Sequence, residues 1–472
     1  MSFGFIKVGA YTPEIKVADV NFNTENIKKG IEEADKKGVR LLVFPELCVT
    51  GYTCGDLFYS DVLLNAAKKA TIEITKFTAG KKMLVFIGIP LKYNGLIYNV
   101  AVGISDGKIK GIVPKTYLPN YNEFYEKRQF TFATSQMIYL NVNGDVLSDN
   151  RTQDIKEDKN RYKVPFGRNI IFSDESDENF KVAAEVCEDL WTPIPPSIFH
   201  WINGATIIVN LSCSDENIGK AEYRRNLVKT HSAKLACGYI YSNEGNGEST
   251  TDMVFAGHNI IAENGVILKQ SELFSEGLIT ADIDVDYIAY ERSKTFNQDF
   301  DIEKEEYVNV FFDSKRESES IERKFEKMPF LPSDKDFAEA ELILTMQAEG
   351  LKKRFLHTNS DKIVIGVSGG LDSTLALIVS VMAIKKSNRS TKDVIAVTMP
   401  CFGTTSRTFL NSVKLAKAFG VSLKKVDISK SVTKHLKDIK HSGIADVTFE
   451  NAQARERTQV LMDIANMTNG LV

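Results

Sequence analysis

The sequence predicts an α/β protein of two domains, the second built on a parallel sheet. Three observations support this. A chain of 472 residues is too long for one hydrophobic core. Apolar runs of strand length recur between segments of helical spacing. The composition changes at Lys315–Lys327, which is dense in Glu, Lys, Arg and Ser and runs into two prolines. We therefore predict a first domain at 1–290, a connector at 291–335 and a second domain at 336–472.

The first domain is predicted to mix strands and helices, whereas the second alternates them. In the first, strands are expected at 5–9, 41–44, 83–89, 182–186, 206–210 and 239–242, with helices at 21–37 and 221–236. A hairpin at 96–104 and 109–113 turns at Asp106-Gly107, and short strands fill 253–283. In the second, a helix at 336–357 precedes strand 362–367, helix 373–384, strand 394–399 and helix 408–419. Such alternation predicts parallel strands joined by right-handed crossovers.

Charge and composition narrow the class of protein. A net charge of -3 does not favour a partner with a phosphate backbone, so no nucleic acid is expected. The apolar run Leu375–Ile384 is too short to span a membrane, and the N-terminus lacks a signal-peptide core. The six cysteines form no CxxC pair, and the six histidines show no metal-ligand spacing. These features favour a cytoplasmic enzyme with reduced thiols and small-molecule substrates.

Three residues that follow apolar strands could together split an amide: Glu46, Lys115 and Cys187. A thiol attacks an amide carbonyl as thiolate, so it needs a base, and a carboxylate can accept that proton. An ammonium group nearby stabilises the thiolate and the oxyanion that forms. Taken singly, these residues are equally well a strand-end glutamate, a surface lysine and a small buried cysteine.

The sequence motifs around these residues resemble those of the nitrilase or carbon–nitrogen hydrolase superfamily: FPEL…GY, PK-x-YLPN-Y-x-EFYE and C-EDLW. The resemblance implies an αββα sandwich over residues 1–290. It also implies that Glu46 is the general base, Lys115 the oxyanion-stabilising lysine and Cys187 the nucleophile, with Glu123 supporting the lysine. Contacts for glutamine are expected from three loop residues, although an ordinary loop role is nearly as good an interpretation: Tyr52, Ser214 and Lys220.

A second pattern, IVIGVSGGLDS at 363–373, predicts a strand, a glycine-rich turn and a helix that bind phosphate. The loop amides and serine hydroxyls suit an anion, and a carboxylate at the mouth suits Mg²⁺ on pyrophosphate oxygens. The pattern lacks the Gly-Lys-Ser/Thr of a Walker loop. It resembles the ATP-pyrophosphatase family, which implies a doubly wound parallel sheet of the adenine-nucleotide α-hydrolase type and ATP binding by Ser368, Gly369, Gly370, Asp372 and Ser373, with Asp372 on the metal.

Two later segments resemble NAD synthetases, VTMPCFGTTSRT at 397–408 and ENAQARERTQVLMDIAN at 450–466. By this resemblance Asn451, Arg455 and Arg457 bind deamido-NAD (nicotinic acid adenine dinucleotide) and phosphate, while an exposed basic face is the alternative. The whole chain resembles bacterial glutamine-dependent NAD⁺ synthetases. That family uses glutamine-derived ammonia, ATP and Mg²⁺ to amidate deamido-NAD, releasing AMP and pyrophosphate, and commonly forms homo-oligomers.

The chain ends at NMTNGLV, with a turn at Asn469-Gly470 before what the pattern indicates is another strand. Because the resemblance implies further sheet beyond this point, we expect a truncated synthetase domain that makes little or no NAD⁺ while the glutaminase remains active. Two alternatives stay open. One is an amidotransferase of another acceptor, and the other is a nitrilase-type amidase with a non-catalytic, nucleotide-sensing C-terminal domain.

Overall fold

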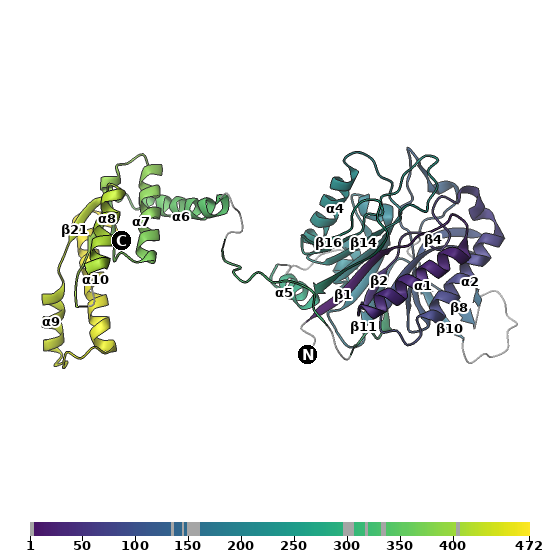
Figure 1. The fold of residues 1–472 in the computed structure, drawn as a ribbon, viewed down its shortest axis with the longest axis horizontal. Helices are drawn as coiled ribbons and strands as arrows, with labels where there is room; N and C mark the ends of the chain where they lie inside the picture. Colours follow the sequence, from purple (N-terminus) through teal and green to yellow (C-terminus); the bar gives the residue numbers. More distant parts are fainter. Residues whose placement is uncertain are drawn as a thin grey trace. The chain divides into compact units, whose positions relative to one another are not determined.

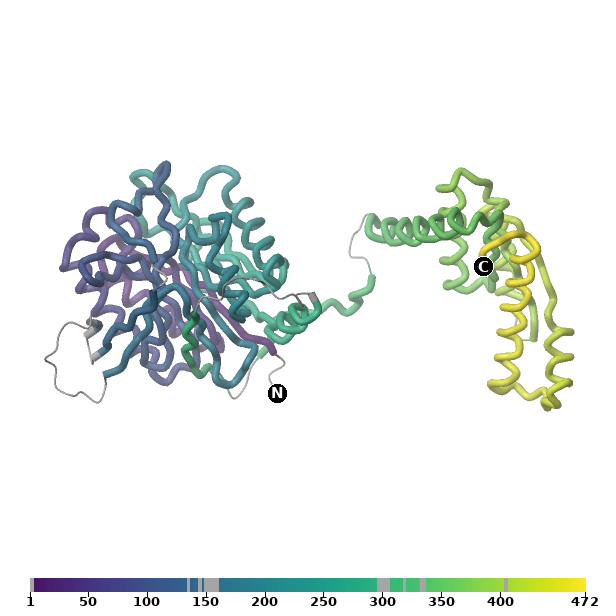
Figure 2. The backbone as a smooth tube through the Cα atoms, turned by 180° about the vertical axis from the view of Figure 1, so that it is seen from behind, coloured from purple at the N-terminus to yellow at the C-terminus, as the bar shows by residue number. Residues whose placement is uncertain are grey.

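The computed structural model describes residues 4–133, 136–143, 146–148, 161–295, 306–316, 320–331, 337–402 and 406–472. The chain divides into two compact units, Met1–Lys324 and Phe325–Val472, and each is described here by itself (Figures 1 and 2). Among the described residues no helix is both long and apolar enough to cross a bilayer.

The first unit contains two large sheets. In the described residues one has the order β17-β1-β2-β3-β4-β5-β10-β8-β9 and the other β16-β15-β14-β13-β12-β11-β18. The strands of the first sheet are β1 (Phe5–Thr12), β2 (Leu41–Val43), β3 (Leu84–Tyr93), β4 (Leu96–Ser105), β5 (Lys108–Pro114), β8 (Ile138–Asn143), β9 (Val146–Ser148), β10 (Tyr162–Phe166) and β17 (Gly277–Asp284). Those of the second are β11 (Ile170–Asp174), β12 (Lys181–Val186), β13 (Ile207–Ser212), β14 (Gly238–Asn243), β15 (Ile260–Glu263), β16 (Val266–Gln270) and β18 (Val308–Phe312).

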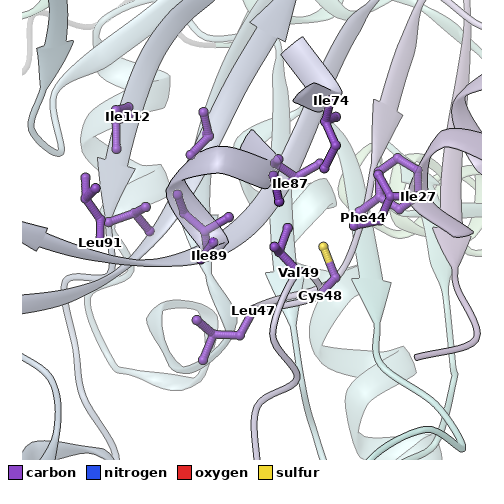
Figure 3. Close-up of a cluster of buried hydrophobic side chains, with 14 of the residues drawn as sticks. Ile27, Phe44, Leu47, Cys48, Val49, Ile74, Ile87, Ile89, Leu91 and Ile112 are labelled. Carbon is purple, nitrogen blue, oxygen red and sulfur yellow. The ribbon is translucent and has the colours of Figure 1, made fainter. Parts of the chain in front are cut away.

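Helices cover the outer face of each sheet, which confirms the predicted αββα sandwich. Helices α1 (Val20–Lys36) and α2 (Asp61–Phe77) pack on the first sheet, and α3 (Pro196–Ile202) and α4 (Lys220–Leu235) on the second. Helix α5 (Val285–Thr295) follows β17. The buried cluster between the first sheet and its helices includes Ile27 of α1, Ile74 of α2 and Ile87 of β3 (Figure 3).

The two sheets face each other across an apolar interior. Phe172 of β11 is fully buried there and packs edge-on against Phe86 of β3, with ring centroids 5.0 Å apart. Gly103 and Gly111 lie beneath this ring, because a Cβ on either residue would stand 2.4 Å or 3.0 Å from Phe172 atoms. Close packing of this kind holds the strand ends of both sheets in one place.

The second unit is a parallel sheet covered on both faces, as the alternating pattern predicts. Its order among the described residues is β21-β20-β19-β22, from β19 (Lys362–Gly366), β20 (Val394–Thr398), β21 (Ser422–Lys425) and β22 (Gly470–Leu471). One apolar cluster joins the sheet to α9 (Ser429–Asp438) and α10 (Val447–Met467). Another lies under α6 (Ala338–His357), α7 (Leu371–Lys386) and α8 (Ser406–Ala418).

The range predicted as a connector, 291–335, is not wholly linker. Strand β18 lies inside it and pairs in parallel with β11, from Ile170↔Val308 to Asp174↔Phe312. Arg323 is tied to the sandwich through hydrogen bonds to Glu263. The strand VNVFF is short and precedes the charged stretch, and residues 296–305, 317–319 and 332–335 of the range lie outside the described part of the chain.

Candidate active site

The three predicted amidase residues follow strands that end at one edge of the sandwich. Glu46 comes after β2, Lys115 directly after β5 of the same sheet, and Cys187 directly after β12 of the opposite sheet. All three are buried, with 0%, 0% and 7% of their surface exposed. Backbone hydrogen bonds fix Glu46 and Lys115 to adjacent strands. The Glu46 N–H donates to the Ser212 carbonyl, and the Lys115 N–H donates to the Asn99 carbonyl.

Lys115 is the centre of a buried ion cluster. Its ammonium donates to Glu46 Oε1 at 2.7 Å and to Glu126 Oε1 at 2.6 Å. Asn99 Nδ2 also donates to Glu46 Oε1, at 2.6 Å, and the backbone N–H of Cys213 donates to Glu46 Oε2 at 3.0 Å. Glu46 is therefore held on both oxygens, and one cation is shared by two carboxylates.

Burial and charge act in opposite directions on these groups. Burial by itself would lower the pKa of Lys115, but the Glu126 and Glu46 carboxylates outweigh it and hold that pKa well above its usual value. Burial raises the pKa of Glu126 to about 7, against the pull of the Lys115 ammonium. Burial and the Glu46 charge likewise raise the pKa of the Cys187 thiol, which Lys115 lowers. The resting thiol is thus protonated and needs a base.

Cys187 stands on a strained turn. Its φ of 45° lies in the left-handed region, which costs a non-glycine residue about 1–3 kcal/mol. Asn210 of the neighbouring β13 holds this turn, because its Oδ1 accepts the Cys187 N–H at 3.1 Å. Asp189 Oδ2 accepts the N–H of Val186 at 2.9 Å. These bonds hold the backbone of the Cys187 turn on both sides of the strand end.

The glutamate that contacts Lys115 is Glu126, whereas the resemblance pointed to Glu123. Glu123 lies in the turn between β6 (Asn120–Tyr121) and β7 (Phe124–Tyr125), is half-buried, and lines a pocket together with Tyr52 and Glu126. Glu126 follows β7, is only 4% exposed, and contacts the Lys115 ammonium. Both glutamates stand in the same motif three residues apart, so only the hairpin geometry distinguishes them.

The predicted glutamine contacts have different surroundings. Tyr52 is buried and its hydroxyl donates to Glu126 Oε1 at 2.9 Å, while Ser214 is buried with its N–H on Asn243. Lys220, at the start of α4, pairs with Asp215 and lies near the rings of Phe124 and Trp191, at 5.5 Å and 5.7 Å.

Sequence reasoning missed Asn99 and Glu188. Asn99 is buried on β4 against Glu46, and Glu188 follows Cys187 and accepts from the Tyr121 hydroxyl at 2.9 Å. Glu188 stands in the C-EDLW motif, so the motif could have identified it. No motif residue surrounds Asn99 in the sequence.

In the second unit the SGGLDS loop joins β19 to α7 as predicted. Ser368 and Ser373 bring their hydroxyls within 3.1 Å, and Gly370 N–H donates to Ser368 Oγ at 3.2 Å. Gly369 has φ of 83°, and a Cβ there would stand 2.4 Å from the Thr408 carbonyl oxygen. The glycine is thus required by both conformation and space. Asp372 is exposed in the first turn of α7.

A cavity of about 550 Å³ opens beside this loop. It is lined by Ser368 and Gly370, by strand-end residues including Val397 and Met399, and by Glu450, Gln453, Arg457 and Leu461 of α10. Five of the predicted residues are not among its lining residues: Gly369, Asp372, Ser373, Asn451 and Arg455. A step of two residues turns a helix by about 200°, so Arg455 and Arg457 lie on different faces.

The fold and the cysteine centre define a carbon–nitrogen hydrolase domain joined to a nucleotide-binding domain. Residues 7–292 match the carbon–nitrogen hydrolase family and residues 343–472 the NAD synthase family. A glutamine-dependent NAD(+) synthetase of Mycobacterium leprae is 35% identical over all of this chain and 69% of its own length. One of Thermotoga maritima is 27% identical, over 95% of this chain and 70% of its own length. The chain belongs to the glutamine-dependent NAD(+) synthetase family.

Among solved structures, a glutamine-dependent NAD⁺ synthetase from Acinetobacter baumannii in complex with ADP aligns with a TM-score of 0.48 and 23% identity, covering 99% of this chain and 74% of that one. A second, from Cytophaga hutchinsonii, aligns with a TM-score of 0.49 and 22% identity, over 99% and 74% of the two chains.

Proposed function

We propose that the first unit hydrolyses glutamine to glutamate and ammonia, with Cys187 as nucleophile, Glu46 as general base and Lys115 as the oxyanion-stabilising cation. The observation that carries this proposal is the buried ammonium of Lys115, 2.7 Å from Glu46 and 2.6 Å from Glu126, beside a thiol on whose pKa all three charges act. A structural ion pair would not require a cysteine on a strained turn at the same place.

The cluster suggests which oxygen of Glu46 moves the proton. Oε1 already accepts from Lys115 and Asn99, whereas Oε2 accepts only the Cys213 N–H among the described contacts. We assign Oε2 as the base. It takes the thiol proton as sulfur attacks the carboxamide carbon, and returns it to the amide nitrogen, which leaves as ammonia. Lys115 stabilises the oxyanion of the tetrahedral intermediate.

Water then completes the hydrolysis through the same groups. Glu46 takes a proton from a water molecule whose oxygen attacks the thioester carbon, and the departing thiolate recovers that proton. The net change is one glutamine and one water to one glutamate and one ammonia. The buried Tyr52 hydroxyl donates to Glu126, and we propose that Tyr52 contacts the glutamine substrate as well. For Ser214 and Lys220 we propose contact with glutamine alone.

The second unit is proposed to bind ATP in the 550 Å³ cavity and to activate deamido-NAD for amidation to NAD⁺, with AMP and pyrophosphate released. The amides and hydroxyls of 368–373 suit the phosphates, and Arg457 faces the same cavity. Mg²⁺ is commonly bound by one or two carboxylates together with phosphate oxygens, so a single carboxylate beside the loop fits this ion. Asp372 would hold it, and the ion would neutralise phosphate charge. Asn451 and Arg455 are proposed dinucleotide contacts from outside the cavity.

Two further properties are proposed, a cytoplasmic location and a homo-oligomeric state. A cytoplasmic location suits an enzyme whose six cysteines are all free thiols, because disulfides form and persist in oxidising compartments. A homo-oligomer would cover the large apolar side chains exposed on α6, among them Leu342 and Met346 at 58% and 66% exposure. Gel filtration with light scattering measures this directly.

The test of the glutaminase is Cys187→Ala, with Cys237→Ala as the matched buried-thiol control. Glutamate release from glutamine should fall to background in Cys187→Ala and stay within about twofold of wild type in the control. A glutamine-analogue electrophile should add mass to Cys187 alone, and ATP with deamido-NAD should speed that labelling if the two units are coupled. Glutamate release by Cys187→Ala at the wild-type rate would remove this function from the thiol.

A further inference from the structure

Lys115 and Cys187 belong to different sheets, so their separation depends on what ties the two loops together. Lys115 follows β5 of the first sheet and Cys187 follows β12 of the second. Packing of the two sheets fixes the strands, whereas Lys115 and Cys187 lie just beyond the strand ends. Catalysis by a cation near a sulfur is sensitive to shifts of this size.

One carboxylate bridges the two loops. Asp189 Oδ1 accepts the N–H of Tyr117 at 2.8 Å and that of Thr116 at 3.1 Å, just after Lys115. Its other oxygen, Oδ2, accepts the N–H of Val186 at 2.9 Å, just before Cys187. The side chain is 1% exposed and these three donors are all backbone amides. Asp189 touches neither the thiol nor the ammonium in any of these contacts.

We propose that Asp189 is a positioning residue that sets the distance between the Lys115 ammonium and the Cys187 thiol by joining their backbones. The proposal rests on the proposed role of Cys187 and adds a residue to it. The carboxylate acts on the strained Cys187 turn from one side and on the Lys115 loop from the other. A single acceptor group thereby couples the nucleophile to the oxyanion-stabilising cation across two sheets.

The surroundings of Asp189 act on its charge in both directions. Burial and the Glu185 charge raise its pKa, the amides of Val186 and Tyr117 and the Lys115 ammonium lower it, and the net result is a pKa of about 8. The amide bridge itself is given by the geometry of the three hydrogen bonds. The competing explanation is that Asp189 only caps the short helix Cys187–Trp191, in which case the bonds to Thr116 and Tyr117 would be incidental.

Asp189→Asn separates these explanations. An amide has one acceptor oxygen, so its NH₂ group must face the N–H of one of the two loops, and the bridge is cut while the volume is kept. We expect kcat for glutamine hydrolysis to fall about 10²-fold with KM within about threefold of wild type. Asp189→Ser is the second variant, because a hydroxyl can still cap Val186 but is too short to bridge. It should lose kcat to a similar degree.

The matched control is Asp174→Asn. Asp174 is also buried and also joins two segments through backbone amides, of Ser176 at 2.9 Å and Ser314 at 3.0 Å, but in no contact with the triad. Its loss of stability should resemble that of Asp189→Asn, while its kcat should stay within about twofold of wild type.

The decisive readout is the rate at which iodoacetamide alkylates Cys187, followed from pH 6 to 9.5 by mass spectrometry. It requires no turnover, so it tests positioning even if glutamine is not the substrate. If Lys115 moves away, the thiol pKa rises, and alkylation at pH 8 should slow at least about tenfold in both Asp189 variants. An alkylation profile identical to wild type in a folded Asp189 variant, or equal slowing in Asp174→Asn, would overturn the proposal.

Discussion

Gly88 of β3 has little room beside the backbone of Glu46, the proposed general base. A Cβ added there would stand 2.2 Å from Leu47 N, 2.6 Å from Pro45 O and 2.8 Å from Glu46 C. Ordinary van der Waals contact begins near 3.4 Å. Because all three atoms are backbone, no side chain can rotate away, and the Pro45–Leu47 segment must retreat by roughly 1 Å to accept the methyl group.

The consequence of Gly88→Ala is a misplaced base in a protein that still folds. Overpacking of this kind costs about 1–3 kcal/mol, which a unit with this much buried core should survive. A shift of about 1 Å in a catalytic group costs about 10²-fold in rate, so kcat for glutamine hydrolysis should fall by about that factor. The Glu46 contacts with Lys115 and Asn99 would lengthen together.

The assay is steady-state glutamate release, beside urea unfolding followed by circular dichroism. Gly350→Ala on α6 is the control, since a Cβ there meets nothing within 4 Å and the helix should gain about 0.5–1 kcal/mol with glutamine hydrolysis unchanged. A folded Gly88→Ala enzyme with wild-type kcat would show that Glu46 does not depend on the position of this backbone, and the reasoning from contact distances would be wrong.

Two further predictions concern stability. Phe172→Ala leaves a cavity between the two sheets, because Gly103 and Gly111 have no side chains to fill the space. The free energy of unfolding of the first unit in urea should fall by about 3–5 kcal/mol. A loss under about 1 kcal/mol would contradict this packing. Burial lowers the pKa of His200 and of His258 to about 4, so between pH 6.5 and 4 the unfolded chain binds more protons and stability must fall as the pH falls through that window. The shift of 6.5 − 4 = 2.5 pH units corresponds to at most about 3 kcal/mol of unfolding free energy per histidine. His200→Gln should therefore lose less stability than wild type between pH 7 and pH 5. An equal loss of stability in the variant would refute the assignment to His200.

Most strands were predictable because apolar runs of four to eight residues have few uses in a soluble chain. Met83–Ile89 and Val394–Met399 became β3 and β20 nearly as expected. Helix α2 was not predicted, and β18, a short apolar strand, lay within the range assigned to a connector. Their signals depend on partners far along the chain. Strand β18 is stabilised by pairing with β11, more than 130 residues earlier, and no local pattern reports that pairing.

The amino-acid sequence by itself determined which residue types can do the chemistry: a carboxylate, an ammonium and a thiol after three strands, and a serine–glycine loop before a helix. Only the tertiary structure decided which groups meet. It placed Glu126 against Lys115 and Asn99 against Glu46, and it directed Arg457 toward the cavity that Arg455 does not line. The reason is that a motif specifies neighbours along the chain, whereas reactivity depends on distances of 2.6–3.1 Å between groups that the turns, strand register and helix faces bring together.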